Sequence, residues 1–132
     1  MTEAPDTNEP GLMVLVIEDV QTEREGLGEL LLLAGFRVVL ARNGFEAMTF
    51  AVERRPAVIL MDLGLPGMDG VETARHLKRE LTTMDIPIIA ITGEALVPDI
   101  ERIRAKGFAG LVAKPVDLAR LLEVIRQAAV SA

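Results

Sequence analysis

The chain has 132 residues, no cysteine and a formal net charge of −6, and half of its residues are hydrophobic. This length and hydrophobic content fit one globular domain whose core folds without covalent cross-links. The negative charge disfavours direct binding to DNA or to anionic lipid, because phosphate groups would be repelled. The absence of cysteine excludes disulfides, thiolate catalysis and cysteine-ligated zinc, and it favours the cytoplasm as the compartment.

The first eleven residues are acidic and polar. They lack the basic and apolar regions of a secretory signal peptide, and no apolar run in the chain approaches the length of a membrane span. We therefore expect a disordered lead over residues 1–11, one domain over residues 12–129 and a short tail over residues 130–132.

Short runs of apolar, mostly β-branched residues recur along the chain, and each run predicts a strand. Segments with helical spacing of apolar residues lie between them. Because the runs are apolar throughout, we expect strands that are buried on both faces, in a parallel sheet with helices on each side. The predicted fold class is α/β, a doubly wound (βα)5 domain. The expected strands are Met13–Ile17, Phe36–Leu40, Ala57–Met61, Ile86–Ile91 and Gly110–Ala113.

The expected first helix has two unusual features. It contains Gly26 and Gly28, each of which weakens a helix by up to about 1 kcal/mol relative to alanine, so its boundary is open at this stage. It also contains four consecutive leucines, Leu30–Leu33, which cover more than one helical face. Leu30 and Leu31 fit the stripe that faces the core. The remaining leucines must then include a surface residue, either an isolated apolar side chain or part of a docking patch.

Polar side chains follow several of the expected strands at their carboxyl ends, which is the edge where doubly wound sheets bind ligands. Each of these residues alone could be a turn residue, a helix cap or a solvated side chain. Core packing explains none of them, and together they indicate a functional site. They are Glu18 and Asp19 after the first strand, Asp62 after the third, Thr92 after the fourth, and Lys114 and Pro115 after the fifth.

Over residues 12 to about 129 the sequence resembles the receiver domains of bacterial two-component response regulators. The motifs that carry the resemblance are "VIEDV", "MDLGLPGMDG", "ITGEA" and "AKP", in this order along the chain. The resemblance implies a flavodoxin-like, five-stranded parallel sheet in the order 2-1-3-4-5. It also implies a phosphorelay function, in which an aspartate accepts a phosphoryl group from a phosphohistidine.

The resemblance assigns a role to each polar residue at this edge. Asp62 would be the phosphoacceptor, and Thr92 and Lys114 would contact the phosphoryl group. Closely packed carboxylates repel one another, and a hard cation such as Mg²⁺, which prefers oxygen ligands, relieves the repulsion. The metal ligands that the resemblance implies are Asp19, Asp62 and the backbone carbonyl of Gly64, with Glu18 acting through water.

Two further features concern the fifth strand. Pro115 matches the cis proline of the family, which directs Lys114 into the site. Many receivers carry tyrosine or phenylalanine three residues before this lysine, whereas this chain has Leu111. An aromatic switch is therefore excluded. Either Leu111 repacks modestly, or the signal travels through the loop after Thr92 and the helix expected within "PDIERIRAKG", residues 98–107.

We expect a stand-alone receiver that uses Mg²⁺ and takes phosphate from a sensor histidine kinase or a histidine phosphotransfer protein. These partners would meet the first helix and the loop after the fifth strand. A downstream protein would contact the fourth helix, the fifth strand and the fifth helix, and neither a nucleic acid nor a membrane is an expected partner. The protein would not be a conventional enzyme, although it would catalyse its own aspartyl phosphorylation and the hydrolysis of the product.

Other functions compete with this interpretation. The chain could be the receiver of a hybrid histidine kinase, or an interaction module that acts without phosphorylation. An aspartate-nucleophile phosphatase would need a carboxylate two residues after the nucleophile, where this chain has Gly64. A flavodoxin-like FMN protein would need a hydroxyl-rich loop after the first strand, but "EDVQTE" stands there and would repel phosphate without a metal. Nucleotide binding by a P-loop is excluded, because no GK[ST] motif occurs.

Overall fold

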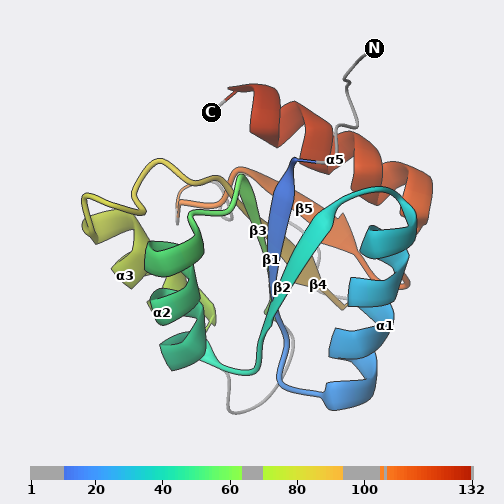
Figure 1. The fold of residues 1–132 in the computed structure, drawn as a ribbon, viewed down its shortest axis with the longest axis horizontal. Coiled ribbons are helices and arrows are strands. Elements are labelled where there is room, and N and C mark those ends of the chain that lie inside the picture. Colours follow the sequence, from blue (N-terminus) through green and yellow to red (C-terminus); the bar gives the residue numbers. More distant parts are fainter. Residues whose placement is uncertain (1–10, 64–69, 94–104, 106, 132) are drawn as a thin grey trace.

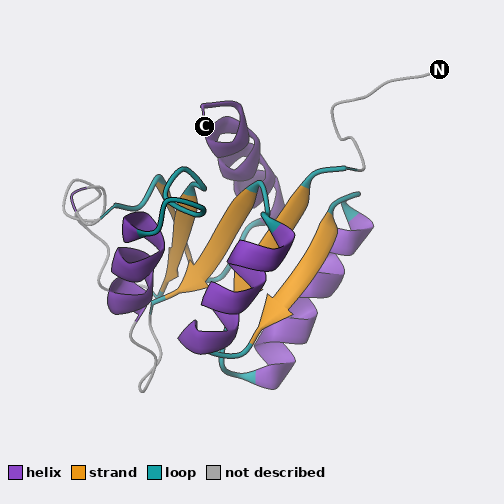
Figure 2. Cartoon of the chain, turned by 60° about the vertical axis from the view of Figure 1, so that its left-hand side comes forward, coloured by secondary structure: helices purple, strands orange, loops and turns teal. Residues whose placement is uncertain are grey.

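The computed structural model describes residues 11–63, 70–93, 105 and 107–131. One parallel sheet in the order β2-β1-β3-β4-β5 confirms the predicted topology, and helices lie on both of its faces (Figures 1 and 2). The strands are β1 (Met13–Ile17), β2 (Arg37–Ala41), β3 (Val58–Asp62), β4 (Ile88–Thr92) and β5 (Gly110–Ala113). The described helices are α1 (Gln21–Leu33), α2 (Gly44–Arg54), α3 (Gly70–Arg79) and α5 (Leu118–Ser131).

The boundaries of β2, β3 and β4 lie later in the chain than the sequence predicts. The largest difference is at the start of β4, where the backbone N–H of Ile86 donates to the carbonyl of Thr83 at 3.0 Å. This bond places Ile86 in the preceding turn and not in the strand. At their other ends β3 and β4 each extend one residue further, so Asp62 and Thr92 are the last residues of their strands.

The sheet buries one apolar layer on each face, because successive side chains of a strand point to opposite sides. In β1, Leu15 belongs to a cluster that includes Leu77 of α3. The next residue, Val16, belongs to the opposite cluster with Leu31 of α1 and Leu121 of α5. The central strands are therefore packed on both faces, and they hold the residues at their ends in fixed positions.

Helix α1 continues through both of its glycines. Gly28 faces β2, and a Cβ atom at this position would lie 3.1 Å from Leu40 Cδ2. Glycine therefore allows α1 to approach the sheet closely at this point. A Cβ atom at Gly26 would meet nothing within 4 Å, so no neighbouring atom requires glycine there.

The leucine run of α1 has one buried member, Leu31. Leu30 is 38% exposed, which corrects the expectation that both of these side chains face the core. Leu32 and Leu33 are 58% and 83% exposed. The reason is helical geometry: consecutive side chains point about 100° apart, so four leucines in a row cannot share one buried face.

Some expectations fall on residues outside the described part of the chain. They concern the lead over residues 1–11, the loop that contains Gly64 and the helix expected over residues 98–107. Of these segments, the structure describes only Gly11, Ala105 and Gly107. Within the described residues, no helix combines the length and the apolar character needed to cross a membrane.

Replacing Gly26 by alanine is expected to raise the free energy of unfolding by up to about 1 kcal/mol, because alanine has the higher helix propensity. Gly28→Ala gains the same propensity but places its methyl group against Leu40, which must shift. We therefore expect a smaller gain, or a loss, at position 28. Urea unfolding of both variants and the wild type measures the difference, and equal gains would show that Leu40 does not restrict this position.

Candidate functional site

Asp62 is held at the carboxyl edge of the sheet by the strand that ends with it. Its side chain is 2% exposed, and β3 pairs with β1 on one side and with β4 on the other. Just beyond Asp62, the backbone N–H of Leu63 donates to the carbonyl of Ile91 at 2.9 Å. Neighbouring strands thus fix the backbone on both sides of the carboxylate.

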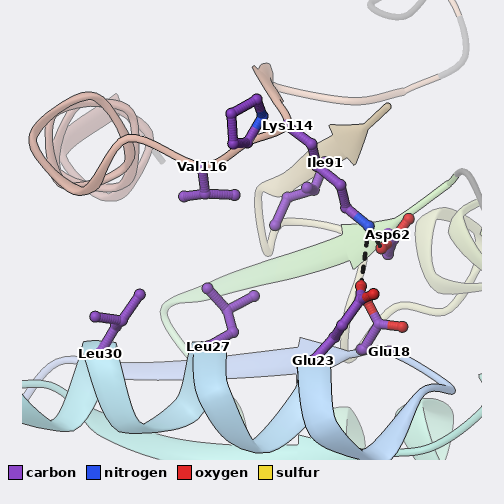
Figure 3. Close-up of a pocket in the computed structure, with 9 residues that line it drawn as sticks. Glu18, Glu23, Leu27, Leu30, Asp62, Ile91, Lys114 and Val116 are labelled. Carbon is purple, nitrogen blue, oxygen red and sulfur yellow. Dashed lines mark hydrogen bonds and ion pairs between the residues drawn. The ribbon is translucent and has the colours of Figure 1, made fainter. Parts of the chain in front are cut away.

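The ammonium group of Lys114 bridges two carboxylates. Its Nζ atom lies 2.6 Å from Oδ2 of Asp62 and 3.1 Å from Oε1 of Glu23 (Figure 3). The backbone N–H of Lys114 donates to the carbonyl of Thr92 at 2.9 Å, and the Lys114–Pro115 peptide bond is cis. Burial by itself lowers the pKa of Lys114, but the contacts with Asp62 and Glu23 outweigh burial and hold this pKa above its ordinary value.

Three carboxylates meet beside this lysine. Side-chain oxygens of Glu18, Glu23 and Asp62 lie within 4.8 Å of one another. The loop after β1 is fixed around Glu18, because its carboxylate accepts a hydrogen bond from the N–H of Val20 at 3.0 Å and its backbone carbonyl accepts one from Nη1 of Arg24 at 2.9 Å. Clustered carboxylate oxygens suit a hard divalent cation, so these residues fit Mg²⁺.

The position of Glu18 raises the pKa of its carboxyl group from 4.5 to about 8. Burial is the largest cause, because it penalises the charged form. A hydrogen bond with Asp62 and the negative charges of Asp62 and Glu23 act in the same direction, whereas the bond from Val20 opposes them. Without a cation, the raised pKa therefore favours the protonated form of Glu18.

The structure brings together part of the predicted set. Glu18, Asp62 and Lys114 converge, and Thr92 lies half-buried at the end of the neighbouring strand. Asp19 is exposed, and it is absent from the carboxylate cluster found among the described residues. Gly64 lies outside the described residues.

Glu23 is a residue that sequence reasoning missed. It lies in the first turn of α1, within the segment "EDVQTE", and its carboxylate joins those of Glu18 and Asp62 in the cluster. Its position in the sequence could have indicated its role, because the first turn of a helix that follows a strand starts at the carboxyl edge of the sheet. Its contact with Lys114 spans 91 residues of sequence, which no local pattern reveals.

Leu111 stands in β5, opposite Ala90 of β4. Its side chain is half-buried and packs against the apolar cluster on the α2 and α3 face of the sheet, which includes Phe108. It therefore contributes to the core without being fully enclosed.

A pocket of about 270 Å³ opens beside the ion pair. It has a charged end and an apolar end, and the apolar side chains extend away from Lys114 between α1 and the start of α5 (Figure 3). Its lining residues are Glu18, Glu23, Leu27, Leu30, Asp62, Ile91, Lys114, Pro115 and Val116.

Comparison with known proteins places this site in context. A profile of the response regulator receiver domain matches residues 14–126. The polar-differentiation response regulator DivK of Brucella anthropi is 36% identical over 113 residues, which cover 86% of this chain and 92% of DivK.

Two similar solved structures support the same relationship. The receiver domain of a sensor histidine kinase from Pseudomonas aeruginosa, which has a magnesium ion coordinated in its active site cleft, is 31% identical with a TM-score of 0.79 and covers 90% of this chain and 98% of that one. FixJ-N is 30% identical with a TM-score of 0.81 and covers 92% of this chain and 95% of that one.

The metal-free protein is expected to lose stability as the pH rises from about 4.5 to about 8, the range between the ordinary and the raised pKa of Glu18. In this range the folded state holds a proton on Glu18 that the unfolded chain has released. Folding therefore binds a proton, and its free energy becomes less favourable with rising pH.

In the Glu18→Gln variant the side chain at position 18 cannot titrate, so the free energy of unfolding should depend less on pH. Urea unfolding in the presence of a chelator, near pH 5 and near pH 8, compares the two proteins. The same pH dependence in both would mean that the pKa of Glu18 is not raised.

Proposed function

The chain belongs to the response regulator receiver domain family, and on this premise we propose that Asp62 accepts a phosphoryl group from a phosphohistidine. The observation that carries the proposal is the buried carboxylate of Asp62 with the ammonium group of Lys114 2.6 Å away. Both side chains line a pocket, so a phosphoryl donor can reach them.

The proposed reaction is a nucleophilic displacement at phosphorus. An oxygen of Asp62 forms the new O–P bond while the P–N bond to the donor imidazole breaks, and the imidazole leaves with the electron pair and takes up a proton. Lys114 stabilises the negative charge on the phosphoryl oxygens, since its ammonium group already lies at the acceptor. Thr92, at the end of the neighbouring strand, donates its hydroxyl hydrogen to another phosphoryl oxygen.

Mg²⁺ is the proposed cofactor, supported by the carboxylate cluster and by the similar receiver that has magnesium in its active site cleft. When bound, it would offset the charge of the carboxylates and of the phosphoryl group. An exposed ligand such as Asp19 is compatible with this ion, which usually keeps several waters. The proposed ligands are Asp19, Asp62 and the carbonyl of Gly64, with Glu18 acting through water.

The apolar end of the pocket supports docking of the phosphohistidine-bearing helix of a sensor histidine kinase or a histidine phosphotransfer protein. Leu27 and Leu30 of α1 face Val116 across this end, next to the reacting groups (Figure 3). A partner that covers these side chains would bring its histidine to Asp62. The receiver of a hybrid kinase is the alternative to a receiver that acts alone, and the cytoplasmic location stays a prediction.

Phosphorylation is proposed to change the face formed by β5, α5 and the expected fourth helix, which a downstream protein then recognises. Thr92 is the residue placed to move, because it ends β4 and leads into the following loop. Leu111 is proposed to shift little.

Asp62→Asn is expected to take up no phosphoryl group from a small phosphodonor with Mg²⁺, whereas the wild type gains one, because the nucleophilic carboxylate is lost. Intact mass measures the difference, and removal of Mg²⁺ by a chelator should prevent labelling of the wild type. Equal labelling of the variant would refute the assignment of Asp62. A wild type that binds its partner identically with and without phosphodonor would favour the phosphorylation-independent module.

Leu30→Ser is expected to slow phosphotransfer from a phosphorylated partner without slowing phosphorylation by a small phosphodonor, since only the partner contacts the apolar end of the pocket. Leu33→Ser is the matched control, because Leu33 lies on the same helix, is more exposed and does not line the pocket. Transfer rates from both phosphoryl sources measure the effect. Equal slowing by the two substitutions would contradict docking at this pocket.

Thr92→Ala is expected to diminish the amide NMR shifts that beryllium fluoride with Mg²⁺ produces in residues 94–107, because the moving hydroxyl is lost. Leu111→Ala should leave most of these shifts intact. Leu111→Ala should lower the free energy of unfolding by less than the roughly 2–5 kcal/mol that a fully buried leucine contributes, since Leu111 is only half-buried. Shifts lost in Leu111→Ala but kept in Thr92→Ala would make the leucine the switch.

A further inference from the structure

We propose that Glu23 is a positioning residue, which holds Lys114 in the unphosphorylated state and competes with the phosphoryl group for its ammonium. The inference rests on the proposed function, because it concerns how the same lysine changes partner. Glu23, in α1, would in this way restrain the response of the site to phosphorylation.

The geometry sets up this competition. Lys114 Nζ lies 2.6 Å from Oδ2 of Asp62 and donates a hydrogen bond to Oε1 of Glu23 at 3.1 Å, so it is held between β3 and α1 (Figure 3). Asp62 is fixed in the sheet, whereas the side chain of Glu23 is 51% exposed. Glu23 can therefore lose its contact with the lysine at little cost, since water replaces it.

The charged residues next to Glu23 have other contacts. Arg24, the next residue, donates to the backbone carbonyl of Glu18. Within the described residues, Lys114 is the cation that contacts Glu23. The charge of Glu23 is therefore directed at the lysine that the phosphoryl group needs.

Phosphorylation reverses the preference of this lysine. A phosphoryl group brings about 1.5 to 2 negative charges to Asp62, and the ammonium group then gains more from phosphoryl oxygens than from one carboxylate. The attraction between Glu23 and Lys114 in the resting state opposes the movement of the ammonium group to the phosphoryl oxygens. Glu23 thus lowers the affinity of the site for a phosphoryl group and favours the resting conformation.

The test compares the affinity of the Mg²⁺-loaded protein for beryllium fluoride in wild type, Glu23→Gln and Glu25→Gln. Calorimetry is the suitable method, because the chain has no tryptophan or tyrosine to report binding. Glu25 is the matched control: it lies on the same exposed helix, loses the same charge and contacts Gln21. We expect Glu23→Gln to bind about twofold to fivefold more tightly, the range for an exposed ion pair, and Glu25→Gln to stay close to wild type.

A third variant separates contact from charge. Glu23→Asp keeps the charge but shortens the side chain by one methylene group, so it should bind more tightly, as Glu23→Gln does. If Glu23→Asp binds as the wild type does while Glu23→Gln binds more tightly, the charge acts at a distance and the positioning role is wrong. Weaker Mg²⁺ binding by Glu23→Gln in the absence of beryllium fluoride would make Glu23 a metal ligand and would also overturn the proposal.

The wild type distinguishes this inference from the proposed function. Wild-type protein that binds no beryllium fluoride would overturn the phosphoacceptor function and the inference with it. Wild-type binding with no gain in Glu23→Gln would overturn only the role of Glu23.

Discussion

The ion pair between Asp62 and Lys114 is the interaction on which the rest of the site depends. A carboxylate that is 2% exposed has lost nearly all contact with water, and it remains charged only if positive charge lies close to it. The ammonium group at 2.6 Å supplies that charge. Among the described residues Glu18 forms no ion pair, and its raised pKa means that its carboxyl group retains a proton to higher pH. The site is therefore short of positive charge, which suits it to bind a cation.

The two apolar layers of the sheet make this charged arrangement possible. Buried residues such as Leu60 and Met61 pack β3 on both faces up to the point where Asp62 begins. Packing of this kind fixes the strand and offsets the cost of placing a charge beside the core. If Asp62 is the nucleophile, as proposed, its position on a fixed strand favours transfer from a bound donor.

Helix α1 contributes side chains to both the charged end and the apolar end of the pocket. Glu23, Leu27 and Leu30 are spaced four and then three residues apart, so they lie on one face of the helix, and all three line the same pocket. A partner that docks on the leucines would therefore cover the carboxylate that holds Lys114. The proposed docking and the proposed release of the lysine would then take place on a single helical face.

Much of this protein was predictable from local patterns in the sequence. The apolar runs fixed the number of strands, because strands buried on both faces must be apolar throughout. Polar residues directly after these runs, such as Asp62 and Thr92, were placed at the correct edge, since the end of a parallel strand defines that edge. The strand order came from the resemblance to a family, because alternation of strands and helices alone allows several orders.

Only the tertiary structure decided which side chains meet. Asp19 is adjacent in sequence to Glu18 but is exposed, whereas Glu23, five residues further along than Glu18, joins the cluster. The contact between Glu23 and Lys114 depends on how α1 lies across the sheet relative to the end of β5, 91 residues away. Local periodicity in the sequence determines which residues reach the edge of the sheet. How closely a helix lies on the sheet is decided by packing in the folded chain, as where Gly28 leaves little room for a Cβ atom beside Leu40.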